Sequence, residues 1–255
     1  MKQDVHAETP PSESFNQRYA KVMRSVWNHP HNDQRPAILR WMKPLSGNYS
    51  SVLDIGAGDA YYLEQLQPTK YTFVEPNETL RQVALAHAAR LSIETVAYST
   101  VADLLSERGT SDACLVLMIH VLFYMERDEI KQLLPKVKGK PLLLVYPHTS
   151  LAVTMRFEES LGLNESLEKI EIMRSLLGRP QTQQVTRSHF RVSLSADLDS
   201  LAFLVGHRTF SSSNYVEKMT LARSFVMRQK HLWKCPNWFE LPQAQVLESY
   251  NIKIK

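Results

Sequence analysis

The chain has 255 residues, 44% of them hydrophobic, which suits one α/β domain with additions and allows a sizeable core. We expect no membrane span, because no uninterrupted apolar run reaches about 18 residues, and no secretory signal, because the first residues are polar. The formal net charge of +4 is mild and does not by itself indicate a nucleic-acid partner.

The first 45 residues are predicted to hold a tail and a helical cover. Residues 1–12 are polar and include two adjacent prolines, so we expect a disordered tail. Apolar side chains recur at helical spacing over residues 13–28 and 33–43. We therefore predict two helices that form an N-terminal cover over residues 13–45.

A glycine turn follows the first predicted strand. Residues 51–55 form a short apolar run, residues 54–59 read D-I-G-A-G-D, and a helix is predicted over about 59–67. Glycine tolerates the positive φ of such a turn, and its missing side chain lets a ligand lie against the backbone. A helix that began there would point its free N–H groups at that ligand.

The residues around the turn limit what it can bind. The dinucleotide pattern needs a third glycine or alanine, and this chain has Tyr61 at that place. The carboxylates of Asp54 and Asp59 would repel a phosphate, but not a ligand with an ammonium and a sulfonium. The next predicted strand, 71–75, ends on Glu75, where an acid can accept hydrogen bonds from ribose hydroxyls.

This combination of turn and acid resembles the class I S-adenosylmethionine-dependent methyltransferases. In that class the glycine turn faces the methionine part of the cofactor, and the acid at the end of the second strand holds the ribose. The resemblance therefore implies S-adenosyl-L-methionine as the cofactor. The alternative is an ordinary strand-turn-helix that binds no ligand.

The order of the elements predicts the fold class. After the turn, predicted strands and helices alternate at 71–75, 78–90, 93–97, 113–118, 126–136 and 142–146. The stretch 113–118 is unbroken apolar sequence, which is typical of a strand covered on both faces. The alternation predicts an α/β fold with a doubly wound, mostly parallel, Rossmann-like sheet, and a cofactor-binding core over 46–149.

The pattern changes after the fifth predicted strand. Residues 150–180 carry helical periodicity and are predicted to form a helical lid over the site. Residues 181–255 are predicted to complete the sheet and to form a substrate region, within one methyltransferase-like domain over 13–255. There the expected elements are a strand at 188–192, helices at 197–205 and 214–230, and a strand near 250–254.

Three further stretches narrow the resemblance. They are residues 19–34, residues 73–77 with the sequence F-V-E-P-N, and residues 118–128, which begin M-I-H-V-L-F-Y-M. Together with residues 54–59 they resemble the histamine N-methyltransferase family of small-molecule methyltransferases. The similarity covers roughly the first 150 residues. It implies transfer of a methyl group to a small amine or amino-acid-like acceptor.

The resemblance also implies residue roles. With Asp54 from the turn, the implied cofactor-binding residues are Asp33, Gly56, Gly58, Glu75, Ser99 or Thr100, and Ile119. The implied substrate-binding residues are Tyr19, Asn32, His120, Phe123 and Tyr124. Two positions depart from the family: its amine-anchoring glutamate is Asn32 here, and its glutamine on the fourth strand is His120. The resemblance therefore supports the cofactor site and does not extend to histamine as the acceptor.

Methyl transfer from a sulfonium is an in-line displacement, so the protein chiefly aligns the acceptor and manages its proton. We expect His120, at the end of the fourth predicted strand, to orient or deprotonate the acceptor, with Tyr19 and Tyr124 as further catalytic residues. Tyr19, Phe123 and Tyr124 would form an aromatic wall for a cationic group. The alternatives are that His120 only bonds a backbone group and that Phe123 only packs in the core.

Three other functions stay open at this point. A related enzyme could use the cofactor without methyl transfer, by cyclising its amino-acid part to azetidine-2-carboxylate. An RNA methyltransferase would use the basic residues late in the chain, although these suit a solvated helix face better and no Asn/Asp-Pro-Pro-Tyr motif ends the fourth strand. A binding module without catalysis is the third.

The remaining histidines and the cysteines carry no predicted site. His29 and His31 lack a third convergent ligand, so we expect no metal. His207, with two other isolated histidines, is interpreted as structural or exposed. Two cysteines lie far apart, with Cys114 expected as a buried free thiol inside a strand, and we expect a cytoplasmic protein.

Overall fold

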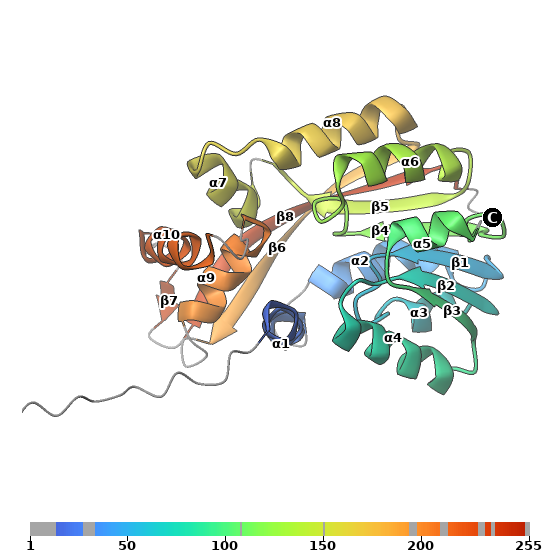
Figure 1. The fold of residues 1–255 in the computed structure, drawn as a ribbon, viewed down its shortest axis with the longest axis horizontal. Coiled ribbons are helices and arrows are strands. Elements are labelled where there is room, and N and C mark those ends of the chain that lie inside the picture. The colour runs from blue at the N-terminus through green and yellow to red at the C-terminus, as the bar shows by residue number, and fades with distance from the viewer. Residues whose placement is uncertain are drawn as a thin grey trace, which may run out of the picture.

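The computed structural model describes residues 14–27, 34–107, 109–149, 151–193, 198–209, 214–228, 233–235 and 238–252. A mixed sheet runs through it in the order β3-β2-β1-β4-β5-β8-β6, with β7 paired to β8 (Figure 1). The strands are β1 Ser51–Ile55, β2 Lys70–Val74, β3 Glu94–Tyr98, β4 Leu115–Ile119, β5 Leu142–Pro147, β6 Thr182–Ser193, β7 Trp233–Cys235 and β8 Trp238–Tyr250.

The first five strands are parallel, and β8 runs antiparallel between β5 and β6. Strand order reverses between β1 and β4, which is the switch point of a doubly wound sheet. The predicted fold class is therefore confirmed. The helices are α1 Phe15–Trp27, α2 Gln34–Met42, α3 Leu63–Leu66, α4 Glu78–Arg90, α5 Val101–Ser106, α6 Arg127–Val137, α7 Val153–Ser160, α8 Glu165–Leu177, α9 Leu198–Gly206 and α10 Tyr215–Arg228, with 3-10 turns at Lys43–Leu45 and His207–Thr209.

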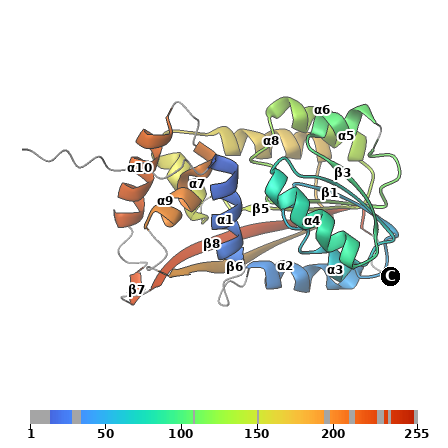
Figure 2. The ribbon, with the colours of Figure 1, turned by 60° about the horizontal axis from the view of Figure 1, so that its bottom comes forward.

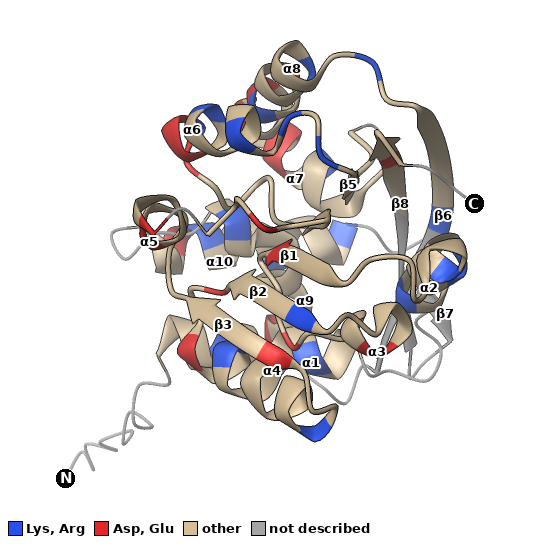
Figure 3. Cartoon of the chain, turned by 90° about the vertical axis from the view of Figure 1, so that its right-hand side faces the viewer, with Lys and Arg blue, Asp and Glu red and all other residues tan. Residues whose placement is uncertain are grey.

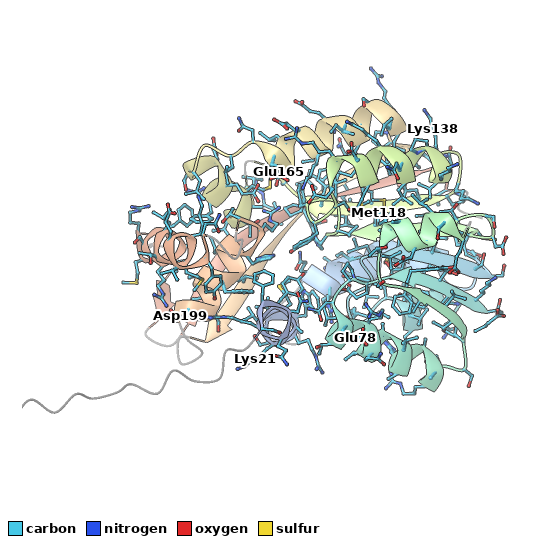
Figure 4. The ribbon with its side chains drawn as sticks, viewed as in Figure 1. Lys21, Glu78, Met118, Lys138, Glu165 and Asp199 are labelled. Carbon is cyan, nitrogen blue, oxygen red and sulfur yellow. The ribbon has the colours of Figure 1, made fainter. Side chains whose placement is uncertain are left out.

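Helices cover both faces of the sheet. On one face α5, α6 and α8 pack over a buried cluster that includes Leu53, Met118 and Ile130 (Met118 is labelled in Figure 4). On the other face α2, α3 and α4 pack over Val52 and Phe73. β4 is buried at all five positions, as its unbroken apolar sequence predicts.

A third apolar cluster forms a lobe beyond the carboxyl ends of the strands, built by α1, α7, α9 and α10. The long strands β6 and β8 extend from the sheet beside this lobe (Figures 1 and 2). The two helices of the predicted 150–180 lid have different places, because α7 joins the lobe whereas α8 packs on α6 over the sheet. Both helices reach the cavity, α7 through Thr154 and α8 through Glu165 and Lys169, so the helical lid over 150–180 stays a prediction.

The described helices differ in charge, and α1 carries only basic charged residues, namely Arg18, Lys21 and Arg24. None of the described helices combines the length and the apolar character that crossing a bilayer demands. Basic and acidic residues are interspersed on α4 and α6 (Figure 3).

Several predicted boundaries were wrong. The helix expected at 59–67 is the four-residue α3, because residues before it form a turn in which Ala60 is left-handed, with a φ of +54°. The strand expected near 250–254 ends at Tyr250 and begins at Trp238. β4 begins at Leu115, where pairing with Val52 starts, so Cys114 is exposed rather than buried. The expected disordered tail, 1–12, lies outside the described residues.

Gly56 closes the turn after β1 under two constraints. Its φ is +73°, and a Cβ built on it would lie 2.4 Å from Cγ2 of Val121. Both its N–H and that of Ala57 donate to the Val74 carbonyl, at 2.8 and 3.1 Å, which ties the turn to the end of β2. A side chain here would therefore strain the backbone and push the segment after β4.

We expect Gly56→Ala to lower the free energy of unfolding by about 2–4 kcal/mol, from left-handed strain plus the Val121 clash. Gly139→Ala is the matched control, because Gly139 has a φ of +90° with nothing within 4 Å, so only about 1–2 kcal/mol of strain applies. Urea titration gives both values. Equal losses in the two variants would show that the Val121 contact does not matter.

Candidate functional site

A cavity of about 760 Å³ lies at the carboxyl ends of β1, β2 and β4, between the sheet and the lobe. This is where open α/β sheets bind ligands. The sheet contributes strand ends and the glycine turn, and the lobe contributes α1 and α9 with the turn that follows α9, which pack against each other. A smaller hollow of about 190 Å³ lies at the amino ends of β1 and β2 and holds none of the predicted site residues.

Glu75 directly follows β2 and is only 7% exposed. Its Oε2 accepts the Gly58 N–H and its Oε1 accepts the Asn77 N–H, both at 2.8 Å. Burial raises the pKa of this carboxyl, against the lowering effect of the two N–H groups. Because a carboxylate has about four lone-pair sites, each oxygen keeps capacity for a ligand hydroxyl. Glu75 thus joins turn and strand and still faces the cavity.

Asp54 lies near the carboxyl end of β1 and also lines the cavity. The carboxyl is 4% exposed and accepts a hydrogen bond from the Tyr71 hydroxyl at 2.9 Å. Burial raises its pKa to about 7, further increased by Glu75 and Asp59. The group is therefore near half-protonated at neutral pH, and a cation in the cavity would favour its ionised form.

The other predicted cofactor residues do not all line the cavity. Gly56, Gly58, Thr100 and Ile119 line the cavity. Ser99 does not, because its hydroxyl donates to Asp103 at 2.8 Å beside the capping box that starts α5. Of the two predicted alternatives, Ser99 and Thr100, Thr100 is thus the one that lines the cavity.

The predicted Asp33 and Asn32 lie outside the described residues, as do His29 and His31. Among the described residues, no three His, Cys, Asp or Glu side chains are grouped so that they could hold a metal ion.

His120 follows β4 with a left-handed φ of +58° and lines the cavity. Its Nε2 lies 2.9 Å from the Gln34 amide nitrogen and 3.0 Å from the Gln245 amide oxygen. A neutral imidazole nitrogen either accepts or donates, so the tautomer follows the orientation of these two amides. Burial lowers the pKa of His120 to about 4. The ring is therefore neutral and a weak base at neutral pH, which suits orienting an acceptor better than deprotonating it.

Tyr19 of α1, Tyr124 after β4 and His207 after α9 line the cavity together and are here called the aromatic wall. The Tyr19 and Tyr124 rings meet edge to face at 6.0 Å, and His207 stacks on Tyr124 at 5.6 Å. His207 Nδ1 donates to the Leu204 carbonyl at 2.8 Å, so Nε2 accepts the Tyr124 hydroxyl proton. Tyr19 in turn donates to Tyr124. Tyr124 is 43% exposed because it faces the open cavity.

His207 is the residue that the sequence reasoning missed. It was interpreted as structural or exposed, but it is buried, lines the cavity and bonds to Tyr124. Burial lowers its pKa to about 4, so it stays a neutral acceptor. The available signal was its place directly after the apolar helix at 198–206, where a lone imidazole ends a buried segment.

Phe123 packs in the core, as one alternative predicted, and its role in binding a substrate stays a prediction. It belongs to the core cluster and also lines the cavity. The Arg208 guanidinium lies 4.7 Å from its ring centroid, and Arg208 is paired with buried Glu158 at 3.0 Å. Buried Lys169 donates to the Phe123 carbonyl and pairs with Glu165, which is labelled in Figure 4. Arg208 and Lys169 each have a carboxylate partner already, so their role is to hold Phe123 in place at the cavity.

Comparison with known proteins agrees with the fold. No protein-family model and no curated protein matches the sequence. A Bacillus halodurans protein provisionally described as a methyltransferase matches with a TM-score of 0.52 and 12% identity, over 84% of this chain and 96% of that one. An S-adenosylmethionine-dependent methyltransferase from Archaeoglobus fulgidus matches with a TM-score of 0.49 and 12% identity, over 91% of this chain and 100% of that one.

A methyltransferase of the same description from Geobacter sulfurreducens, crystallised with S-adenosyl-L-homocysteine, matches with a TM-score of 0.48 and 14% identity, over 91% of this chain and 97% of that one. At such identities the likeness concerns the fold alone. The Bacillus halodurans structure carries the conclusion that this chain has the Rossmann-like fold found in methyltransferases.

The raised pKa of Asp54 has a consequence for stability. The pKa of the Asp54 carboxyl is 3.8 in the unfolded chain and about 7 in the folded protein. At pH values between these two, the folded state therefore binds more protons than the unfolded state. Stability therefore falls as pH rises through that window. Comparing thermal unfolding at about pH 5 and about pH 8, we expect Asp54→Asn to remove about 2–3 kcal/mol of the loss seen in the wild type.

Asp128→Asn is the control, because its side chain is 84% exposed and should leave the pH profile unchanged. Parallel pH profiles for the wild type and Asp54→Asn would contradict the assignment of this titration to Asp54.

Proposed function

We propose that this protein is an S-adenosyl-L-methionine-dependent methyltransferase that acts on a small molecule with an amine or amino-acid-like acceptor. The observation that carries the proposal is the pairing of Glu75 with the glycine turn across one end of a cavity of about 760 Å³ in a methyltransferase fold. A cytoplasmic location, which the low cysteine count favours, is part of the same proposal.

The sheet side of the cavity suits the nucleoside and the sulfonium. The Glu75 oxygens have free lone pairs for the two ribose hydroxyls, and the turn leaves backbone open beside them because Gly56 and Gly58 lack side chains. Asp54 and Asp59 place negative charge near the turn, which favours a ligand that carries an ammonium and a sulfonium.

The aromatic wall suits the acceptor. The Tyr124 hydroxyl donates a hydrogen bond to His207 and accepts one from Tyr19, so its oxygen keeps a lone pair with which to orient an acceptor N–H. Aromatic faces also stabilise the positive charge that moves from sulfur to nitrogen during transfer. In the reaction the amine lone pair forms the N–C bond, the C–S bond breaks, and the sulfur leaves as a neutral thioether with both electrons.

Neither histidine that lines the cavity is a strong base for the proton of the acceptor. His120 and His207 are both weak bases, since burial lowers each pKa to about 4. A buried cavity itself favours the neutral amine that must attack. We place His120, Tyr19 and Tyr124 as orienting groups. The resemblance to histamine N-methyltransferases supports the proposed cofactor site. It does not support histamine as the acceptor, because Asn32 replaces the glutamate that would hold an amine.

Calorimetry with S-adenosylmethionine and S-adenosylhomocysteine tests the cofactor half. We expect both to bind, and Glu75→Gln to weaken each by about 1–3 kcal/mol, because one charged acceptor is lost. Glu78→Gln is the control, since that side chain is 61% exposed and lies outside the cavity. No heat with either nucleoside from the wild type would refute the proposal.

Mass spectrometry of products from a panel of amines and amino acids completes that test. A methylated product with S-adenosylhomocysteine supports methyl transfer. Methylthioadenosine without any methylated product would instead indicate cyclisation of the cofactor.

We expect Tyr124→Phe to lower kcat about tenfold while S-adenosylhomocysteine affinity stays unchanged, because one orienting hydrogen bond to the acceptor is lost. Steady-state kinetics with the acceptor found in the panel measures this. Tyr98→Phe is the control, because its hydroxyl donates to Glu107 away from the cavity. An unchanged kcat in Tyr124→Phe would mean that the aromatic wall only packs and does not orient the acceptor.

A further inference from the structure

Arg35, the second residue of α2, is a buried cation at the edge of the cavity. It is 6% exposed and lines the cavity beside the glycine turn. Its Nη2 donates to Asp59 Oδ1 at 2.6 Å. The guanidinium lies between the rings of Trp27 and Tyr61, at 4.4 and 4.2 Å from their centroids. Two rings and one carboxylate therefore fix its position.

One nitrogen of this guanidinium has no hydrogen-bond partner within the part of the chain that the structure describes. Among the described residues, the buried side-chain nitrogen and oxygen atoms without a hydrogen bond are Arg35 Nη1, His87 Nε2 and Gln245 Nε2. Of these three, Arg35 alone is charged and lines the cavity. Leaving a buried charged donor unsatisfied costs about 1–3 kcal/mol, so a bound anion would repay that cost.

The surroundings select the kind of anion. Asp54, Asp59 and Glu75 line the same end of the cavity, so a doubly charged phosphate would meet three carboxylates. A single carboxylate attached to an ammonium avoids that repulsion, because the ammonium can face the acids while the carboxylate faces Arg35. An α-amino acid group has this arrangement of charges.

We infer that Arg35 Nη1 binds the α-carboxylate of the cofactor's amino-acid part. This inference rests on the proposed function and assigns a carboxylate subsite within the same cavity. The cofactor is favoured over the acceptor as the source, because Arg35 is bonded to Asp59 in the glycine turn that the proposed function assigns to the cofactor.

Two nucleosides separate this subsite from the rest of the site. S-adenosylhomocysteine carries the amino-acid group, and methylthioadenosine lacks it. By calorimetry we expect Arg35→Gln to weaken S-adenosylhomocysteine binding about 10- to 100-fold and methylthioadenosine binding less than about twofold. Arg40→Gln is the matched control, because Arg40 is exposed on the same helix and should change neither.

A second variant guards against misfolding. Arg35→Gln leaves Asp59 without its cation, so the double variant Arg35→Gln with Asp59→Asn removes both charges together. We expect it to unfold near the wild-type temperature and still to lose the preference for S-adenosylhomocysteine over methylthioadenosine.

The other outcomes overturn the inference in distinguishable ways. Equal weakening of both nucleosides would make Arg35 a support for the turn. An unchanged affinity for S-adenosylhomocysteine, with a raised KM for an amino-acid acceptor, would assign the carboxylate to the acceptor. Unchanged binding of both nucleosides, with no change in KM, would mean that Arg35 binds no ligand. In these three cases the proposed function stands, whereas a wild type that binds neither nucleoside refutes that function as well.

Discussion

The site depends on the carboxylate of Glu75, which accepts the N–H groups of Gly58 and Asn77 at 2.8 Å. These two bonds join the turn after β1 to the segment after β2, so neighbouring strand ends are held at a fixed separation. The Val74 carbonyl adds two backbone bonds to the same turn. Because Glu75 is bonded on its protein side, its remaining lone pairs face the cavity in a defined direction, which is the preorganisation that recognition of a ribose diol requires.

The second half of the site comes from the lobe. Long strands β6 and β8 place α9 and α10 beyond the sheet, and the helices pack with α1 and α7 around their own apolar cluster. This arrangement brings His207 to Tyr19 and Tyr124, three side chains from distant parts of the chain. The sheet thus supplies charge and open backbone, while the lobe supplies neutral, hydrogen-bonded aromatic groups. Such a division suits a cationic cofactor that donates to an uncharged acceptor.

Sequence reasoning succeeded where local rules decide the structure. The glycine turn and the acid after β2 both follow from backbone requirements within a few residues. It failed where distant contacts override them. The helix expected at 59–67 shortens to α3 while Asp59 and Tyr61 in the turn before it engage Arg35. β8 was misplaced because it buries polar residues, among them Glu248, which accepts hydrogen bonds from Tyr146 and Tyr250. Arg35 carries no local signal at all, and the signal of His207 is only its place directly after the apolar helix α9.

The lobe also has a consequence for how the protein assembles. Arg18 on α1 donates to the hydroxyl of Tyr215 on α10 at 2.9 Å, across 197 positions of the chain. Closing so large a loop is entropically costly and belongs late in folding, whereas β1, β2 and the turn between them form from near neighbours. During synthesis on the ribosome, the residues of the turn and Glu75 are thus available to pair before the lobe side of the cavity has been made.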